Sequence, residues 1–288
     1  MRIKSFAKVN LGLEVIRKRE DGYHEVRTLL QAVNLYDVLE FRKTTEQGLI
    51  LKGDDPSISW GSDNLIYRAA LLLKRGCRLS GGIEIQVTKT IPPGKGLGGG
   101  SSNAAMTLYA LNEIWELNLN VKTLIDFGKE LGADVPFFLK GGLCQGKERG
   151  DDVAPVPDLK PLWCLLVLPR FSISTASVYG QLQLSLTSES KDSKIIKFLD
   201  SRQLGSLENG LEETVFRLYP QLKPIKAYFQ DQESELSLVS GSGSAVFGLF
   251  SDRDRAEKAL KELEKQYPTV LVETLSREQY WENIRAGV

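Results

Sequence analysis

The sequence contains a single histidine and three cysteines among its 288 residues. Cys77, Cys144 and Cys164 are odd in number and widely spaced, and one histidine cannot complete a zinc site with them. A structural zinc site and a disulfide framework are therefore both disfavoured. The cysteines instead predict reduced thiols, which are typical of a cytosolic protein.

Net charge and long apolar runs are also lacking. The 37 basic and 37 acidic residues cancel, so no overall field would attract nucleic acid or an anionic membrane. No run of about 18 apolar residues occurs, and the opening MRIKSFAKVNLGLEV alternates like a strand and lacks the apolar core of a signal peptide. We expect a cytoplasmic protein, monomeric or a weak homodimer, that binds neither nucleic acid nor membrane.

Apolar periodicity divides the first half of the chain into strands and helices. Alternation of apolar and polar residues predicts strands over 2–16, 38–52 and 82–91. Helical periodicity predicts helices over 64–74, 103–117 and 121–131. Asp63 is a candidate cap for the first of these helices, and Gly132 is expected to end the last one.

A proline-rich and charged run, RGDDVAPVPDLKP, predicts a boundary between two lobes, 1–155 and 156–288. After it, WCLLVLP indicates a buried strand, and LSLVSGSGSAVFGLF indicates two apolar strands around a glycine–serine loop. A charged amphipathic helix over 252–267 and a last strand in TVLVETL complete the pattern. This order predicts a small α+β sandwich for the second lobe.

The most informative segment is IPPGKGLGGGSSNAA, residues 91–105, which lies between a predicted strand and a predicted helix. Backbone N–H groups of a glycine-rich turn can converge on an anion, and the start of a helix adds its positive dipole end. Ser101 and Ser102 can cap the helix or present hydroxyls to a phosphate or a metal. The segment predicts a polyphosphate-binding loop; a flexible connector would rarely lie between a strong strand and a strong helix.

Three common phosphate-binding motifs fit this loop poorly. In a Walker loop, GK is followed by Ser or Thr, whereas here Gly96 follows Lys95. Gly94, Gly96 and Gly99 satisfy GxGxxG, but no acidic residue ends a second strand about 20 residues later, as a dinucleotide site requires. A protein-kinase glycine loop leads into a strand, and this one leads into a helix.

The run PPGKGLGGGSSNAA, which begins at Pro92, resembles the phosphate loop of the GHMP small-molecule kinases. The resemblance extends, in the expected order, to AKVNLGLEV (7–15), DGYHEV (21–26), GADVPFFL (132–139) and SGSGSAVFG (240–248). It implies a two-lobed α+β fold with an N-terminal lobe of mixed sheet and helices, a C-terminal ferredoxin-like α/β sandwich, and an active site in the cleft between them. The motifs have the form seen in a branch that phosphorylates the 2-hydroxyl of a cytidine diphosphate-linked alcohol in non-mevalonate isoprenoid biosynthesis.

The resemblance implies ATP with Mg²⁺ as co-substrate and no tightly bound cofactor. It places Asn64 and Leu65 near the adenine, although a plain helix cap explains these two nearly as well. No acidic cluster in the sequence indicates a protein ligand set for the metal. The loop residues that it assigns to ATP binding are Pro92, Pro93, Gly94, Lys95, Gly96, Leu97, Gly98, Gly99, Gly100, Ser101 and Ser102.

Lys8 and Asp134 match the catalytic positions of the family. A carboxylate beside the acceptor hydroxyl can take its proton, and an ammonium can stabilise the charge of the transferred phosphoryl group. From pattern alone, Lys8 is an ordinary solvent-facing strand lysine, and Asp134 is equally consistent with a turn aspartate that bonds local backbone. The resemblance favours the catalytic interpretation of both residues.

Five further residues are expected on the acceptor side. Tyr23 and His24 match the pair that contacts the cytidine diphosphate, and an imidazole offers a donor and an acceptor to a base edge. Thr175 and Tyr179 lie four residues apart, hence on one helical face, and the aromatic residue of this pair stacks on the base in the family. Asn10 shares a strand face with Lys8 and is expected to bond the acceptor. A satisfied turn histidine and core packing of Tyr179 stay open as alternatives.

Two positions depart from the family pattern. Lys95 stands in the loop where a small or apolar residue is more usual, and it is expected to reach a phosphate or point to solvent. Glu148 replaces the first glycine of a G-x-G-E pattern, which leaves the local turn open. Two other functions also stay open: a GHMP kinase acting on mevalonate, homoserine or a sugar, and a non-catalytic nucleotide-binding module.

Overall fold

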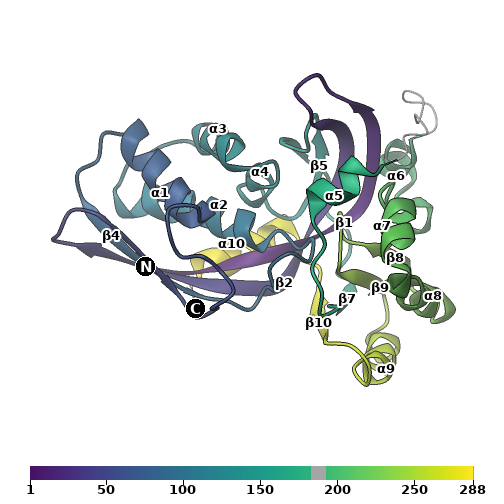
Figure 1. The fold of residues 1–288 in the computed structure, drawn as a ribbon. Helices are drawn as coiled ribbons and strands as arrows, with labels where there is room; N and C mark the ends of the chain where they lie inside the picture. The colour runs from purple at the N-terminus through teal and green to yellow at the C-terminus, as the bar shows by residue number, and fades with distance from the viewer. Residues whose placement is uncertain (183–192, 288) are drawn as a thin grey trace.

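The computed structural model describes residues 1–182 and 193–287, which form two lobes, each built on one sheet (Figure 1). In the first lobe, neighbouring strands run in the order β3, β4, β2, β5 and β6, and β1 pairs with β2. β3 runs parallel to β4 and the other pairs are antiparallel, so the sheet is mixed. The strands are β1 (Arg2–Lys18), β2 (His24–Thr44), β3 (Leu49–Gly53), β4 (Gly82–Thr88), β5 (Leu143–Lys147) and β6 (Asp152–Pro155).

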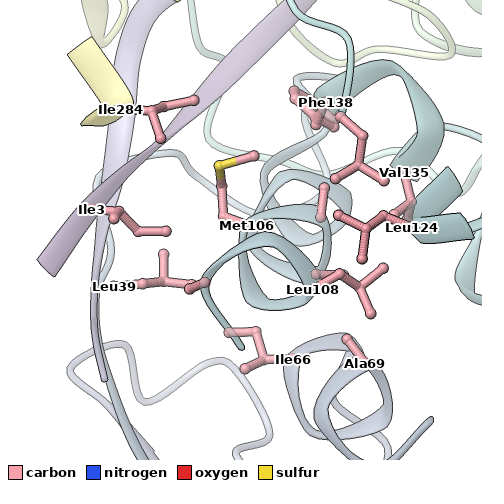
Figure 2. Packing of buried hydrophobic residues seen from close by; sticks show 14 of the residues in the cluster. Ile3, Leu39, Ile66, Ala69, Met106, Leu108, Leu124, Val135, Phe138 and Ile284 are labelled. Atoms are coloured by element: carbon pink, nitrogen blue, oxygen red, sulfur yellow. The ribbon is translucent and has the colours of Figure 1, made fainter. Parts of the chain in front are cut away.

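Helices pack with this sheet around one apolar cluster. They are α1 (Leu65–Gly76), α2 (Gly99–Ile114), α3 (Val121–Leu131) and α4 (Val135–Phe138). Figure 2 shows Ile3 of β1 and Leu39 of β2 on one side of the cluster, Leu124 of α3 and Val135 of α4 on the other, and Met106 of α2 between them. Every residue of α2 from Ser102 to Leu108 is buried, so α2 is the central helix of the lobe. This burial holds the start of α2 in a fixed place beside the sheet.

The second lobe has a four-stranded antiparallel sheet in the order β10, β7, β9, β8. Its strands are β7 (Trp163–Val167), β8 (Leu236–Val239), β9 (Val246–Phe250) and β10 (Thr269–Glu273). Its helices are α5 (Thr175–Gly180), α6 (Lys194–Ser201), α7 (Glu212–Leu218), α8 (Lys223–Asp231) and α9 (Arg253–Leu263), with 3₁₀ turns η1 (Leu204–Ser206) and η2 (Pro220–Leu222). Strand, helices, two strands, helix and strand follow the ferredoxin-like order, so the predicted sandwich is confirmed.

The two lobes share structural elements. Ala7, Val9 and Leu11 of β1 pack in a cluster with residues of β7 and β9, so the first strand contributes to the contact between the lobes. The last helix, α10 (Arg277–Arg285), returns to the first lobe, where Tyr280 donates a hydrogen bond to the Phe138 carbonyl at 2.8 Å. The apolar pattern of the sequence gave no indication of this return. Across the described ranges, no helix is both long enough and apolar enough to cross a membrane.

Several predicted boundaries are wrong. The strand expected over 38–52 is two strands: β2 begins as early as His24 and ends at Thr44, and β3 starts at Leu49. The helix expected over 103–117 begins at Gly99, inside the glycine-rich run, because glycine can also adopt helical angles. The cap of α1 is Asn64, whose side chain accepts from the Ile66 N–H at 2.9 Å, while Asp63 instead accepts from the Ser59 hydroxyl.

Candidate active site

A first cavity of about 410 Å³ lies along the glycine-rich loop. One end is lined by apolar groups of Ile58, Trp60, Leu65, Ile91 and Pro92. The other end is formed by the loop backbone from Gly94 to Gly100 and by Ser101. An apolar slot that continues into a row of peptide groups suits a ligand with a flat base at one end and phosphates at the other.

The loop conformation depends on glycines at alternate positions. Gly94, Gly96 and Gly98 have φ of 68°, 76° and 72°, in the left-handed region that favours glycine. A Cβ at Gly96 would lie 2.0 Å from the Ser240 carbonyl oxygen, and a Cβ at Gly98 would lie 2.8 Å from the Phe138 ring. Alternation of left-handed glycines turns successive N–H groups toward one side, which is the geometry of an anion-binding nest.

Helix α2 starts directly after this turn. Its N-cap is Gly98, which has no side chain to accept a hydrogen bond from the first turn of the helix. The first N–H groups of a helix have no intrahelical acceptor, and they carry the positive end of the helix dipole. An anion bound by the loop would therefore also receive hydrogen bonds from the start of α2.

Asp37 of β2 fixes the loop to the helix. Its buried carboxylate accepts from the backbone N–H groups of Thr90 and Ile91 at 2.7 and 2.8 Å and from the Asn103 amide at 2.9 Å. It also forms an ion pair with Lys89, which lines the first cavity. One carboxylate thus holds both the entry of the loop and the first turns of α2.

Not every residue assigned to this loop faces the cavity. Ser101 lines the cavity, but Ser102 is fully buried and its hydroxyl lies 2.7 Å from that of Ser5. Neither serine caps α2, since the cap is Gly98. Asn64 and Leu65 do line the apolar end, although the Asn64 side chain is also occupied as the α1 cap.

Lys95 was expected to reach a phosphate or to point to solvent, and its side chain does neither. Its side chain lies 7% exposed, and its ammonium donates to the carbonyls of Pro169 and Phe171 at 2.7 and 2.5 Å. Burial lowers the pKa of this ammonium. Its charge points into the second lobe, away from solvent.

A second cavity of about 700 Å³ adjoins the first, and Gly96 and Ser101 line both. Its walls come from β1, β2, the turn before α4, α5 and the loop between β8 and β9. Its lining includes all seven residues predicted for catalysis and the acceptor: Lys8, Asn10, Tyr23, His24, Asp134, Thr175 and Tyr179. Segments that are far apart in the chain thus meet in one cavity.

Lys8 and Asp134 form an ion pair, with Lys8 Nζ 3.7 Å from Asp134 Oδ2. Lys8 is 3% exposed, so the prediction of a solvent-facing lysine from pattern alone is wrong. Burial lowers the pKa of its ammonium, and the Asp134 carboxylate opposes that shift. The Asp134 side chain is 38% exposed and, among the described residues, makes no cap hydrogen bond to α4, so its free oxygen faces the cavity.

Asn10 lies beside this pair on the same face of β1. Its side-chain oxygen accepts from the Lys8 ammonium, and its amide nitrogen donates to the Thr28 hydroxyl at 2.9 Å. Thr28 in turn donates to the Gly12 carbonyl at 2.9 Å. This chain of hydrogen bonds fixes the direction of the Lys8 side chain.

Aromatic rings line part of the second cavity. The His24 and Tyr179 rings lie with centroids 5.0 Å apart and planes tilted by 31°, although they come from β2 and α5. Burial, and then the charge of Lys18, lower the pKa of His24, so its imidazole is neutral at pH 7. Thr175 shares a hydrogen bond of 2.8 Å with Ser242. The exposed Tyr23 ring lies 5.3 Å from the Arg149 guanidinium.

Known proteins resemble this chain in sequence and in fold. The family model described as "GHMP kinases N terminal domain" matches residues 64–142, and "GHMP kinases C terminal" matches residues 195–269. A 4-diphosphocytidyl-2-C-methyl-D-erythritol kinase of Thermodesulfovibrio yellowstonii is 40% identical, over 94% of this chain and 97% of its own. The chain belongs to the 4-diphosphocytidyl-2-C-methyl-D-erythritol kinase family of GHMP kinases. A relative of the same name from Syntrophus aciditrophicus is 41% identical, over 90% of this chain and 93% of its own.

A solved structure supports the same assignment. A crystal structure of 4-(cytidine 5′-diphospho)-2C-methyl-D-erythritol kinase superposes with a TM-score of 0.82 at 34% identity, covering 95% of this chain and 99% of the other. The predictions of a GHMP kinase family and of a two-lobed fold are therefore confirmed. Membership of this family also gives ATP as the co-substrate and small molecules as the ligands.

Sequence reasoning missed several residues that line the two cavities of this GHMP kinase. Trp60 contributes a large ring to the first cavity, with its indole N–H bonded to the Asp55 carbonyl at 3.1 Å. Arg149 and Ser242 line the second cavity. Trp60 lies only four residues before Asn64, so the turn-rich run PSISWGSDN offered a signal. Ser242 lies inside the SGSGSAVFG motif, which offered a signal as well, whereas Arg149 offered none.

Proposed function

We propose that this chain transfers the γ-phosphoryl group of ATP to the 2-hydroxyl of 4-diphosphocytidyl-2-C-methyl-D-erythritol, a step of non-mevalonate isoprenoid precursor biosynthesis. The observation that carries the proposal is the contact between the two cavities. They share Gly96 and Ser101, and the Lys8–Asp134 pair lies on the wall of the second cavity. Phosphoryl transfer needs such an arrangement, because donor and acceptor must approach in line.

ATP occupies the first cavity in this proposal. The adenine lies at the apolar end near Trp60 and Leu65, and the phosphates lie on the backbone from Gly94 to Ser101. Peptide N–H groups and the α2 dipole offset the negative charge of the phosphates. The terminal phosphate reaches Gly96 and Ser101, where the second cavity begins.

Asp134 accepts the proton of the attacking hydroxyl. Its carboxylate makes no competing cap bond within the described residues, and it faces the cavity. General-base assistance of this kind contributes typically about 10²–10⁴-fold in rate. Lys8 pairs with this carboxylate and stabilises the charge of the transferred group, while Asn10 directs the Lys8 ammonium.

The cytidine part of the acceptor occupies the aromatic end of the second cavity. The Tyr179 ring provides a face for stacking on the base, and neutral His24 offers one donor and one acceptor to the base edge. Tyr23 and Thr175 complete this wall. A base-sized aromatic site favours a nucleotide-bearing acceptor over mevalonate or homoserine.

Magnesium is expected to enter with ATP. Among the described residues, no cluster of three or more His, Cys, Asp or Glu side chains is arranged to hold a metal ion. Mg²⁺ commonly keeps several waters and binds through substrate phosphates with one or two protein groups. Ser101, which lines both cavities, and Asp134, which lines the second, carry oxygens that fit this limited role. The ion would neutralise phosphate charge there.

Two further expectations belong to the same proposal. The lobe boundary between residues 155 and 156 falls in the connection from β6 to β7, with α10 returning to the first lobe. A cytoplasmic location and a monomer or weak homodimer rest on composition alone.

The test is ADP release by the purified protein with ATP and magnesium across four acceptors. The panel holds 4-diphosphocytidyl-2-C-methyl-D-erythritol, mevalonate, homoserine and galactose, each run in parallel with Asp134→Asn. We expect turnover of the cytidine compound alone, reduced about 10²–10⁴-fold in the variant. Turnover of another acceptor would contradict the roles of Tyr23 and His24. ATP binding without any turnover would favour the non-catalytic module.

A further inference from the structure

Lys95 is a buried cation inside the loop assigned to ATP. Its ammonium is bonded to the carbonyls of Pro169 and Phe171, and no acidic side chain pairs with it in the part of the chain that the structure describes. Burying a charge is costly unless hydrogen bonds compensate it. Two carbonyl dipoles at 2.7 and 2.5 Å supply that compensation. The ammonium therefore stabilises one particular placement of the loop against the second lobe.

Several weaker contacts follow the same boundary between the lobes. The Lys95 carbonyl accepts from the Ala245 N–H at 3.1 Å, and the Gly96 carbonyl accepts from the Ser240 hydroxyl at 2.9 Å. Within the second lobe, the Phe171 carbonyl also accepts from the Ser244 hydroxyl at 2.6 Å. Lys95 adds a charge-assisted bond to this neutral set, and such bonds are roughly twice as strong as neutral ones.

The acceptors of Lys95 lie next to the acceptor cavity. Pro169 and Phe171 belong to the connection between β7 and α5, and α5 begins only four residues after Phe171. Thr175 and Tyr179, on α5, line the second cavity. The Lys95 side chain thus joins the wall of the first cavity to the segment that carries a wall of the second.

We propose that Lys95 is a positioning residue, whose bonds to the Pro169 and Phe171 carbonyls hold the ATP loop at a fixed distance from α5. This inference rests on the proposed function, because it assigns ATP to the loop and the acceptor to the α5 side. In-line transfer is sensitive to this distance, and a misplacement of about 1 Å can cost roughly 10²-fold in rate. The Lys95 side chain acts through the loop, because its ammonium is bonded to carbonyls of the second lobe.

Lys95→Met tests the proposal because methionine keeps an unbranched apolar stem and removes the donors. We expect kcat to fall about 10- to 100-fold. The dissociation constants of a non-hydrolysable ATP analogue and of the acceptor, each measured alone, should stay within about threefold, since each cavity survives separately. Lys160→Met is the matched control: Lys160 is an exposed lysine before β7, and its loss should leave all these values unchanged.

Two results from binding and kinetics would overturn the proposal. If the Lys95 ammonium leaves these carbonyls and contacts a phosphate, Lys95→Met would weaken binding of the ATP analogue at least about tenfold, while the affinity for adenosine stayed constant. If kcat stayed within threefold of the unmodified protein, the bonds would have no positioning role.

Hydrogen exchange gives a readout that does not depend on activity. In Lys95→Met, the peptides covering 92–98 and 170–176 should exchange about tenfold faster, with the α2 core unchanged. Faster exchange throughout the chain would show a general stabilising role and overturn the proposal. Lys95→Gln, which keeps one donor group, replaces the methionine variant if that one does not fold. An unmodified protein inactive on every acceptor would contradict the proposed function, and the exchange result would still decide the role of Lys95 in joining the lobes.

Discussion

The two cavities are built in opposite ways. The phosphate end of the first is backbone from one continuous run, Gly94 to Gly100. The second is made of side chains from β1, β2, α5 and several turns, which only the complete fold brings together. A backbone site depends on φ angles and space, whereas a side-chain site depends on the chemistry of each group. Substitutions should therefore affect the first cavity through geometry and the second through recognition.

Gly96→Ala should have the largest effect because it changes the backbone shared by both cavities. A methyl group would lie 2.0 Å from the Ser240 carbonyl, at a φ of 76° that alanine rarely adopts. The loop must move, so we expect kcat/KM for ATP to fall by about 10²-fold or more. Steady-state kinetics measures this.

Gly205→Ala is the control for that change. An added methyl group there would approach nothing closer than the Glu235 carbonyl at 3.8 Å, so activity should be unaffected. Equal activity of Gly96→Ala and the unmodified protein would show that the loop geometry is not needed for ATP.

Tyr179→Ala should affect the acceptor side only. Loss of stacking between an aromatic ring and a base costs roughly 1–3 kcal/mol, or about 5- to 150-fold in acceptor affinity. Calorimetric titration should show this loss with ATP-analogue affinity intact. Tyr179→Phe keeps the ring, so its acceptor affinity should stay within about threefold of that of the unmodified protein. A loss of affinity as large as that of Tyr179→Ala would mean that the hydroxyl, and not the ring face, binds the acceptor.

Acceptor binding should depend on pH through His24. The pKa of His24 is lowered from its ordinary value of 6.5, so the imidazole is mostly neutral above pH 6.5 and gains a proton only as the pH falls through that lowered pKa. Protonation removes its acceptor nitrogen, so the acceptor KM should be constant from pH 8 to 7 and rise by up to about tenfold per unit below the pKa. His24→Gln keeps a donor and an acceptor without titrating. A pH profile of the variant that matches the unmodified protein would assign the titration to another group.

Glu148 should give the smallest effect. It adopts a φ of 59°, which favours glycine, at the position where the family pattern has glycine. Glu148→Gly and Glu148→Ala both lose the ion pair with Arg19, so their comparison isolates the backbone. We expect the glycine variant to be more stable by about 1 kcal/mol in urea unfolding. Equal stabilities would mean that the turn carries no such strain.

The same contrast explains what the sequence could predict. The glycine-rich loop was predictable because its conformation depends on neighbouring residues, and its left-handed glycines are found where the pattern placed the turn. The partnership of Lys8 with Asp134 was not predictable from periodicity, which made Lys8 solvent-facing. Only the family resemblance joined these two positions.

Some contacts could be predicted neither from the apolar pattern nor from the family resemblance. The interlobe bonds of Lys95 form across the boundary between the lobes, where no local rule applies. The burial of Ser102 against Ser5 depends on how α2 packs on β1. The return of α10 to the first lobe rests on the fit of Tyr280 into the first cluster. Each of these contacts is set by tertiary packing.

The most direct test of the two-cavity account is a crystal structure with a non-hydrolysable ATP analogue and 4-diphosphocytidyl-2-C-methyl-D-erythritol bound together. We predict the triphosphate along Gly94 to Ser101, the cytosine stacked on Tyr179 with its edge at His24, and the acceptor 2-hydroxyl within hydrogen-bond distance of Asp134. A triphosphate bound away from the glycine-rich loop, or an acceptor hydroxyl remote from Asp134, would contradict the account.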